Sequence, residues 1–223
     1  MRLFKHLIPI ALLGLVATVQ ADAPAWSAAS LEKTLQAMPA GDAMRGQRVH
    51  EQYFCASCHG THGESVSRNW PNLAAQRAPY VYKMMLDYRD GRRHEDERAE
   101  IMVVLANMLS EQEMADVAAF YAESGEQERA PLRRDHPADA LVRKGDPKRL
   151  LTACASCHGV DGQGGRNETP ALAGQPREYL HRTMLLFRDG RRDNDAHAGM
   201  AQFAWDLSDA EIAAVADYYS ATE

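Results

Sequence analysis

The 223-residue sequence has few cysteines and no excess of basic side chains. Lysine and arginine total 25, against 31 aspartates and glutamates, so the formal net charge is −6 at pH 7. A negative chain repels a phosphate backbone, which argues against nucleic acid as a partner and allows attraction towards a basic protein surface. Long apolar runs are also lacking, because the run over residues 7–19 is too short to span a bilayer comfortably.

The N-terminus has the features of an export signal. Arg2 and Lys5 give a charged start, the apolar run follows, and Val19-Gln20-Ala21 is similar to a small-residue cleavage site. We therefore predict a cleaved signal peptide over residues 1–21, with an uncleaved membrane anchor as the alternative. Removal of this signal deletes two basic and no acidic residues, so the formal charge changes from −6 to −8.

All four cysteines lie in two copies of one hexapeptide, Cys-Ala-Ser-Cys-His-Gly, at residues 55–60 and 154–159. Each copy reads C-x-x-C-H, the attachment signature of a c-type haem. Two cysteines three residues apart on a helical turn can each bond one haem vinyl group, and the next residue places an imidazole under the iron. The sequence thus predicts two covalently attached haem c groups. The residues predicted to hold them are Cys55, Cys58, Cys154 and Cys157 as thioethers, with His59 and His158 as proximal iron ligands.

Two other uses of paired cysteines explain less of the sequence. A disulfide within each C-x-x-C, as in a thioredoxin-like enzyme, leaves the following histidine unexplained in both copies, and the surrounding sequence has no clear βαβ pattern. A zinc site would need both pairs, which lie 99 residues apart, far beyond the usual spacing of a zinc ribbon.

Much of the remaining chain repeats at the same offset of 99 residues. Asp-Gly-Arg-Arg occurs at residues 90–93 and 189–192, and Pro-x-Leu-Ala at residues 71–74 and 170–173. Helical periodicity surrounds both copies, so the expected fold class is all-α, with two tandem domains related by internal duplication. The expected parts are a signal peptide at 1–21, an N-terminal extension at 22–40, domains at 41–123 and 141–223, and a linker at 124–140.

Several helix boundaries are predicted from local signals. A helix over residues 42–54 is expected to deliver the first motif, and a second helix is expected to begin at Pro79. A loop is expected over residues 92–101, followed by a last helix that opens with a capping box at Ser110. In the second half, Pro147 predicts that the delivering helix begins later than its counterpart.

The N-terminal extension contains one apolar helical face. Leu31, Leu35 and Met38 fall on that face, which predicts a short amphipathic helix. We expect it to pack as a strap on the first domain, with docking of a partner as the alternative.

The function depends on the residue that faces each iron opposite its histidine. An open face binds oxygen or peroxide, whereas a methionine-capped haem transfers electrons. Met102 and Met200 are the candidates, because each precedes the last helix of its half by the same seven-residue step to a Leu-Ser pair. We expect both of them on loops. Met85 and Met184 also repeat, but their spacing within the middle helix indicates packing beside the haem.

These residues resemble the cytochrome c4 family, di-haem class I cytochromes c of bacterial periplasms. The features that carry the resemblance over residues 41–223 are the two Cys-Ala-Ser-Cys-His-Gly stretches, the Arg-Asp-Gly-Arg repeats, the Met-to-Leu-Ser spacing and the tyrosine-rich final helices. The resemblance implies two class I cytochrome c domains related by a pseudo-twofold, with haems that face each other near the domain contact.

The same resemblance implies an electron carrier in the periplasm rather than an enzyme. Its partners would be redox proteins, with a donor such as a quinol-oxidising complex and an acceptor such as a terminal oxidase. Any association with the membrane would run through those partners, and nucleic acid is not expected.

Further residue roles follow from the resemblance. The carbonyl of Pro71 or Pro170 would accept the Nδ1 proton of the proximal histidine. Gly46 and Gly145 would allow close contact with the final helix of each half, or would serve as loop or cap residues. The arginines of the two Asp-Gly-Arg-Arg stretches would either neutralise haem propionates or lie solvated at a helix end.

Two other functions stay open at this point. The chain would be a haem subunit of a periplasmic oxidoreductase complex if the extension binds an enzyme. A di-haem peroxidase-like enzyme would need an open haem and an acid–base group. The only candidates for that group are His94 with Glu95 and His197 with Asp195, and neither pair is matched in both halves.

Overall fold

The computed structural model describes residues 23–125 and 135–220. The predicted signal peptide lies outside the described residues, as does most of the predicted linker. The described part is helical and contains no strand, only isolated bridges between Asp146 and Leu151 and between Gln175 and Ser220. The all-α prediction is therefore confirmed. None of the described helices is long and apolar enough to cross a membrane.

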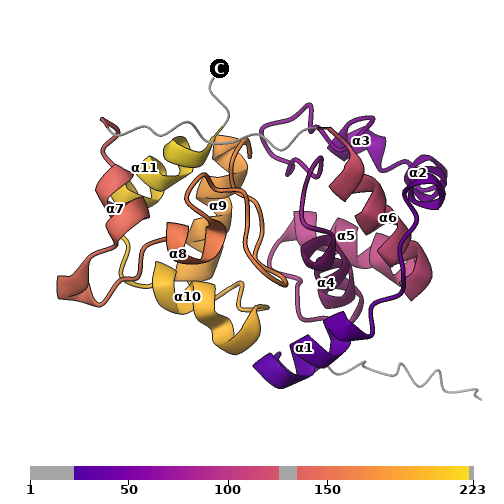
Figure 1. Cartoon of the computed structure of the whole chain (residues 1–223), viewed down its shortest axis with the longest axis horizontal. Helices are drawn as coiled ribbons and strands as arrows, with labels where there is room; N and C mark the ends of the chain where they lie inside the picture. The colour runs from indigo at the N-terminus through magenta and orange to yellow at the C-terminus, as the bar shows by residue number, and fades with distance from the viewer. Residues whose placement is uncertain (1–22, 126–134, 221–223) are drawn as a thin grey trace, which may run out of the picture.

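The helices form two lobes that lie side by side (Figure 1). The first lobe contains α2 (Ala43–Gln52), α3 (Ala56–His59), α4 (Ala78–Arg89), α5 (Glu97–Met108) and α6 (Glu111–Glu123). The second contains α7 (Asp139–Lys144), η1 (Pro147–Arg149), α8 (Ala155–His158), α9 (Arg177–Arg188), η2 (Ala196–Ala198), α10 (Gly199–Ala204) and α11 (Asp209–Tyr219). In both lobes the short helix of the Cys-Ala-Ser-Cys-His motif is followed by a long middle helix and a final helix.

The final helix of each lobe begins at a capping box. Ser110 accepts from the backbone N–H of Glu113, whose carboxylate accepts in return from Ser110, and Ser208 and Glu211 repeat this arrangement at α11. The reciprocal bonds satisfy backbone donors that have no partner within the helix. Met114 and Ile212 are completely buried one turn further on, so each cap fixes the start of a core helix.

The two equivalent glycines have different roles. Gly46 lies in α2 where a Cβ atom would clash with the carbonyl oxygen of Asp116, so its absence lets α2 pack directly on α6, as expected. The same expectation is wrong for Gly145. That residue ends α7 with a φ of +69°, and a Cβ there would meet the carbonyl oxygen of Leu151 rather than the final helix. Gly145 therefore serves as a helix cap.

The delivering helix predicted after Pro147 is absent from the second lobe. Pro147 opens only the single 3₁₀ turn η1, in which the side chain of Asp146 accepts from the N–H of Lys148. Leu150 then takes a left-handed conformation with a φ of +55°, which stops helical growth. The chain reaches Cys154 without an α-helix, and the helical segment α7 lies on the other side of Gly145.

The loop predicted over residues 92–101 is shorter than expected. Asp96 accepts from the N–H groups of Arg98 and Ala99 at 3.0 and 2.9 Å, and this N-cap starts α5 at Glu97. Met102 therefore lies within a helix. Met200 likewise lies in the first turn of α10. The expectation that both methionines sit on loops is therefore wrong. For Met102 the physical reason is the Asp96 cap, whereas α10 begins without a side-chain cap at Ala198.

The extension forms the short helix α1 (Ala28–Gln36) that the apolar face predicts. Leu31 is buried, and Leu35 and Met38 pack against the core of the first lobe. Trp26, just ahead of α1, also accepts a backbone hydrogen bond from His197 of the second lobe, at 3.3 Å. The extension is thus a strap on the first lobe that reaches the second.

Candidate haem-binding site

One largely apolar cavity of about 450 Å³ runs between the two lobes. Its walls include Cys55, Cys58 and His59 of the first motif and Cys157 and His158 of the second. Met102 and Met200 also line it. Cys154 is the one predicted site residue outside the lining, and it packs beside the core of the second lobe.

The two motif histidines are oriented in the same way. Nδ1 of His59 lies 3.1 Å from the carbonyl oxygen of Pro71, and Nδ1 of His158 lies 3.0 Å from that of Pro170. A carbonyl only accepts hydrogen bonds, so each Nδ1 carries the proton and each Nε2 keeps a free lone pair. Burial lowers the pKa of both imidazoles, against the opposing effect of the proline carbonyls. Each histidine is therefore a neutral ring ready to ligate a metal.

None of the four motif cysteines forms a disulfide. Burial raises the pKa of Cys55, and it raises that of Cys154 to about 11. Among the described residues, no cluster of three or more His, Cys, Asp or Glu side chains is arranged to hold a metal ion, so the zinc alternative has no support. The cysteines and histidines suit a group that brings its own metal.

The methionines lie on separate helices of the cavity wall. Met102 is in the second turn of α5. Met200 is the second residue of α10, and its N–H donates to a carboxylate oxygen of Asp195 at 2.7 Å. Both side chains are half-buried and line the cavity. Met85 and Met184 line it as well, from the middle helices. The structure therefore brings a methionine from each lobe to the same cavity as the two histidines.

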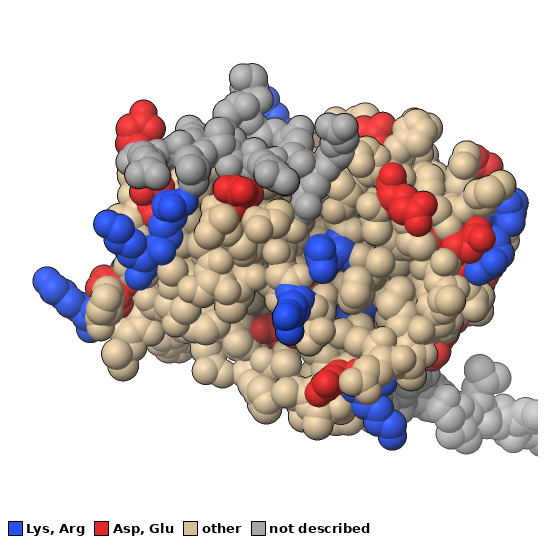
Figure 2. Space-filling model, viewed as in Figure 1, with Lys and Arg blue, Asp and Glu red and all other residues tan. Residues whose placement is uncertain are grey.

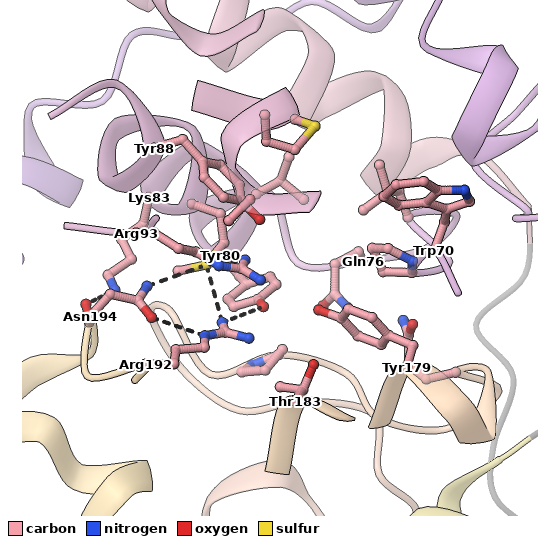
Figure 3. A pocket seen from close by; sticks show the side chains of 18 of the residues that line it. Trp70, Gln76, Tyr80, Lys83, Tyr88, Arg93, Tyr179, Thr183, Arg192 and Asn194 are labelled. Carbon is pink, nitrogen blue, oxygen red and sulfur yellow. Dashed lines mark hydrogen bonds between the residues drawn. The ribbon is translucent and has the colours of Figure 1, made fainter. Parts of the chain in front are cut away.

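Two buried arginines mark the junction of the lobes (Figure 3). Arg93 forms an ion pair with Glu95 at 2.9 Å. Arg192 donates to Asn194 at 3.0 Å and to the hydroxyl of Tyr80 at 3.5 Å, but no carboxylate of the described residues lies within ion-pair distance of it. The carboxylate of Glu95, which pairs with Arg93, also acts on Arg192, so two buried guanidinium groups share one carboxylate. This excess of buried positive charge is costly, so this part of the cavity suits a negatively charged group.

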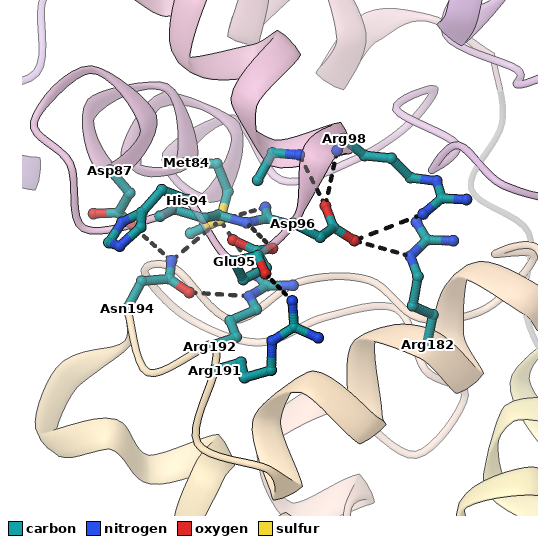
Figure 4. A network of polar contacts seen from close by, with 12 residues as sticks. Met84, Asp87, His94, Glu95, Asp96, Arg98, Arg182, Arg191, Arg192 and Asn194 are labelled. Carbon is teal, nitrogen blue, oxygen red and sulfur yellow. Dashed lines mark hydrogen bonds and ion pairs between the residues drawn. The ribbon is translucent and has the colours of Figure 1, made fainter.

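The first arginine of each Asp-Gly-Arg-Arg stretch, Arg92 or Arg191, makes its contacts outside the cavity. Arg92 stacks over the ring of Trp26, with 4.0 Å from its Cζ to the ring centroid, and Arg191 donates to the carbonyl of Glu95. Neither of them lines the cavity. The four arginines thus separate into two that line the cavity and two that tie chain segments together. Figure 4 shows Arg191 and Arg192 close to Glu95.

The rival histidines lie away from the cavity. Among the described histidines, His59 and His158 alone line it. His94 is exposed, and its Nδ1 lies 2.8 Å from the carbonyl of Gly91. His197 lies within η2 in a left-handed conformation, and its N–H donates to the carbonyl of Trp26 in the strap. The acid–base pairs expected for a peroxidase-like site are therefore not assembled in the cavity.

Sequence reasoning missed four cavity residues that come in matched pairs. Tyr80 and Tyr179 line the junction, as do Gln76 and Gln175. Each pair is separated by the 99-residue offset that relates the two motifs. The signal was present in the repeat, but which residues face the other lobe depends on packing between lobes.

Comparisons with known proteins agree with this architecture. The model of the cytochrome c family matches residues 43–123 and 146–222. Cytochrome c4 of Thiocapsa roseopersicina is 35% identical over 184 residues, covering 80% of this chain and 91% of the relative. The thiosulfate dehydrogenase electron acceptor of Stutzerimonas stutzeri is 32% identical, covering 87% of this chain and 94% of the relative.

Solved structures give the same result. Reduced recombinant cytochrome c4 from Pseudomonas stutzeri superposes with a TM-score of 0.70 at 31% identity, covering 81% of this chain and 98% of that one. Thiosulfate dehydrogenase from Marichromatium purpuratum has a TM-score of 0.68 at 31% identity, and the match covers 79% of this chain but 39% of that one. The protein is therefore a cytochrome c of the cytochrome c4 family, an electron carrier that binds haem c covalently.

Proposed function

We propose that the chain carries two haem c groups in the periplasm and passes single electrons between a respiratory donor and a terminal oxidase or other acceptor. The observation that carries this proposal is the single cavity that connects both Cys-Ala-Ser-Cys-His motifs across the lobe junction. Residues 41–123 and 141–223 would each form one haem domain, and residues 1–21 would be removed on export.

The residues present fit the group. Cys55 with Cys58, and Cys154 with Cys157, would form the thioethers, and His59 and His158 would ligate the irons from one side. Met102 and Met200 would ligate them from the other. The buried guanidinium of Arg192, which has no carboxylate of the described residues within ion-pair distance, fits a propionate carboxylate.

When bound, haem c supplies a one-electron Fe(III)/Fe(II) couple. The chain's own residues hold and tune that couple. Pro71 and Pro170 fix the tautomer of the proximal histidines, while the two methionines would occupy the position at which a substrate would otherwise bind. The largely apolar walls would keep water away from the bound haem, which disfavours the more highly charged oxidised site. We therefore expect positive reduction potentials and no substrate chemistry.

The surface suits brief encounters with redox partners. Phe54 and Ile101 line the cavity and are also exposed, so apolar side chains reach its rim at the first lobe. On the face shown in Figure 2, charged side chains are scattered, with a few basic ones near the middle, and neither sign forms a continuous patch. Contact through a small apolar rim favours fast dissociation, as a shuttle requires.

A second candidate is an acceptor or subunit for one particular enzyme. It is favoured by the two relatives named as thiosulfate dehydrogenase electron acceptors, at 32% and 29% identity. Mixing the oxidised protein with a purified thiosulfate dehydrogenase and thiosulfate distinguishes the two. Rapid reduction together with a stable complex on gel filtration supports the dedicated acceptor, and reduction without a complex supports the general shuttle.

Iron ligation tests the proposal itself. Methionine ligation of ferric haem gives a far-red charge-transfer band, and two equivalents of that band per chain are expected in the oxidised protein. High-spin ferric features, or rapid binding of cyanide, would instead support the peroxidase-like alternative.

A further inference from the structure

Two glutamines occupy equivalent positions in the two lobes and cross the junction in opposite directions. Gln76 lies just before α4 and Gln175 just before α9, at the 99-residue offset of the repeat. Their exposed fractions are 4% and 5%. Figure 3 shows Gln76 directed towards the second lobe.

Each side-chain amide holds both polar backbone groups of one residue in the other lobe. Gln76 donates from Nε2 to the carbonyl of Ala171 at 3.0 Å and accepts at Oε1 from the Ala171 N–H at 2.8 Å. Gln175 donates to the carbonyl of Asn72 at 2.7 Å and accepts from the Asn72 N–H at 3.0 Å. Asn72 and Ala171 are themselves equivalent positions, so the two contacts are reciprocal.

The residues held in this way adjoin the prolines that orient the motif histidines. The N–H of Ala171 and the carbonyl of Pro170 belong to one peptide group, which is planar and rigid. Gln76 therefore binds one end of a peptide whose other end accepts from Nδ1 of His158. In the other direction, Gln175 binds the N–H of the peptide whose carbonyl accepts from His59.

A hydrogen bond at the N–H of a peptide polarises its carbonyl and makes that oxygen a stronger acceptor. The carbonyl then draws the Nδ1 proton more strongly and makes the imidazole a more electron-rich ligand. The same contact also fixes the plane of the peptide, and with it the direction of the carbonyl.

We propose that Gln76 and Gln175 are positioning residues that act across the junction, each on the proximal histidine of the other lobe. The inference rests on the proposed ligation of the irons by His59 and His158. Through these contacts the potential of each haem depends on the hydrogen bonds that its lobe receives from the other lobe. The alternative is that the two glutamines only stabilise the contact between the lobes. That role does not predict a change in the potential of one particular haem.

The test uses the full mature protein with both haems attached. Gln76→Met and Gln175→Met keep side-chain length and burial but remove both hydrogen bonds. Gln47→Met is the matched control, because Gln47 is an exposed residue of α2 that bonds to Glu51 of its own helix. Spectroelectrochemical titration measures the two potentials, and NMR signals of the haem methyl groups assign each potential to a lobe.

We expect Gln76→Met to raise the potential of the second haem, because a less electron-rich imidazole stabilises Fe(III) less. At the wild-type midpoint of that haem, its reduced-to-oxidised ratio should rise several-fold, while the first haem stays unchanged. Gln175→Met should raise the potential of the first haem and leave that of the second unchanged. Gln47→Met should change neither potential. A shift confined to the variant's own lobe, equal shifts of both haems, or no shift would overturn the inference.

If one variant fails to fold, the other decides the question, because each concerns a different histidine. The wild-type spectrum separates this inference from the proposed function. A wild-type protein without two histidine-ligated haems would refute the function, whereas correct ligation without the crossed shifts would refute this inference alone.

Discussion

The indole Nε1 of Trp26 donates a 2.6 Å hydrogen bond to Oδ1 of Asp87, a carboxylate with no exposed surface. The other oxygen of Asp87 lies 2.6 Å from Nζ of Lys83, also fully buried, and accepts from Asn194 of the second lobe. Three parts of the chain thus meet at one carboxylate: the N-terminal strap, helix α4 and the loop before α10. The strap therefore forms part of the junction between the lobes.

Replacement of Trp26 by phenylalanine should destabilise the protein. The Phe ring still packs beneath Arg92, but one oxygen of Asp87 loses its donor inside the junction, at a cost of about 1–3 kcal/mol in the free energy of unfolding. Trp205→Phe is the matched control, because Trp205 is 76% exposed and its loss should change stability by less than about 0.5 kcal/mol. Guanidinium unfolding of the haem-loaded proteins measures the free energy of unfolding of both variants. Equal losses in the two would contradict a stabilising role of the Trp26–Asp87 hydrogen bond.

Acid stability should depend on Glu211 in α11. The guanidinium of Arg149, 2.6 Å from its carboxylate, lowers the pKa of Glu211 from 4.5 to about 2. Between these values the unfolded chain binds the proton and the folded chain does not. The stabilisation is therefore complete above about pH 4.5 and is lost as the pH falls through about 2.

Solvent screening at this half-buried pair limits the effect to about 1 kcal/mol. Glu211→Gln retains the capping box, but its free energy of unfolding should not show the decrease in acid that protonation of Glu211 causes. Glu113→Gln makes the same change in the capping box of α6, where no lysine or arginine of the described residues lies within ion-pair distance, and it should retain the loss. Unfolding curves at several pH values measure the free energy of unfolding of the wild-type protein and the two variants. The same decrease below pH 4.5 in all three proteins would contradict this role of Glu211.

Replacement of Met200 by histidine should lower the potential of the second haem. Histidine is a stronger donor to Fe(III) than a thioether, so the oxidised state gains more. The first haem and the helical circular dichroism should be unchanged. Met108→His is a control on the exposed surface of α5 and should leave both potentials as they are. An unaltered second potential in Met200→His would exclude Met200 as a ligand.

Loss of one thioether should affect only one lobe. Cys154→Ala leaves Cys157 and His158 in place but removes one of the two covalent attachments predicted for the second haem. Mass spectrometry and haem stain of the purified chain should find the first haem intact and the second incompletely attached. Loss of both haems would show that the lobes do not fold independently.

The sequence predicted the parts of the fold that depend on local signals. Two C-x-x-C-H motifs, two capping boxes and the 99-residue repeat are each visible within a few residues, and the helices they predict are present. The start of α5 was missed because Asp96 was hidden among neighbouring charges, although an aspartate ahead of acidic residues is a typical N-cap. Gly145 and Gly46 have equivalent positions in the sequence, yet only the packing of α7 and η1 decides that Gly145 is a cap.

Contacts between the lobes were beyond local reasoning. Nothing near Gln76 in the sequence indicates that its amide reaches Ala171, and nothing near Trp26 indicates that its indole reaches Asp87. Such contacts depend on how two finished lobes fit together. The histidine-to-proline bonds were anticipated through the family resemblance, and the distances in both lobes agree with it.

The far-red absorption of the oxidised protein with both haems attached tests the central claim most directly. If His59 with Met102 and His158 with Met200 ligate the two irons, the methionine charge-transfer band should have twice the intensity per chain of a mono-haem cytochrome c, and it should halve in Met200→His. A band of single intensity in the wild-type protein, or none, would mean that at least one iron lacks a sulfur ligand, and the two-haem carrier described here would be wrong.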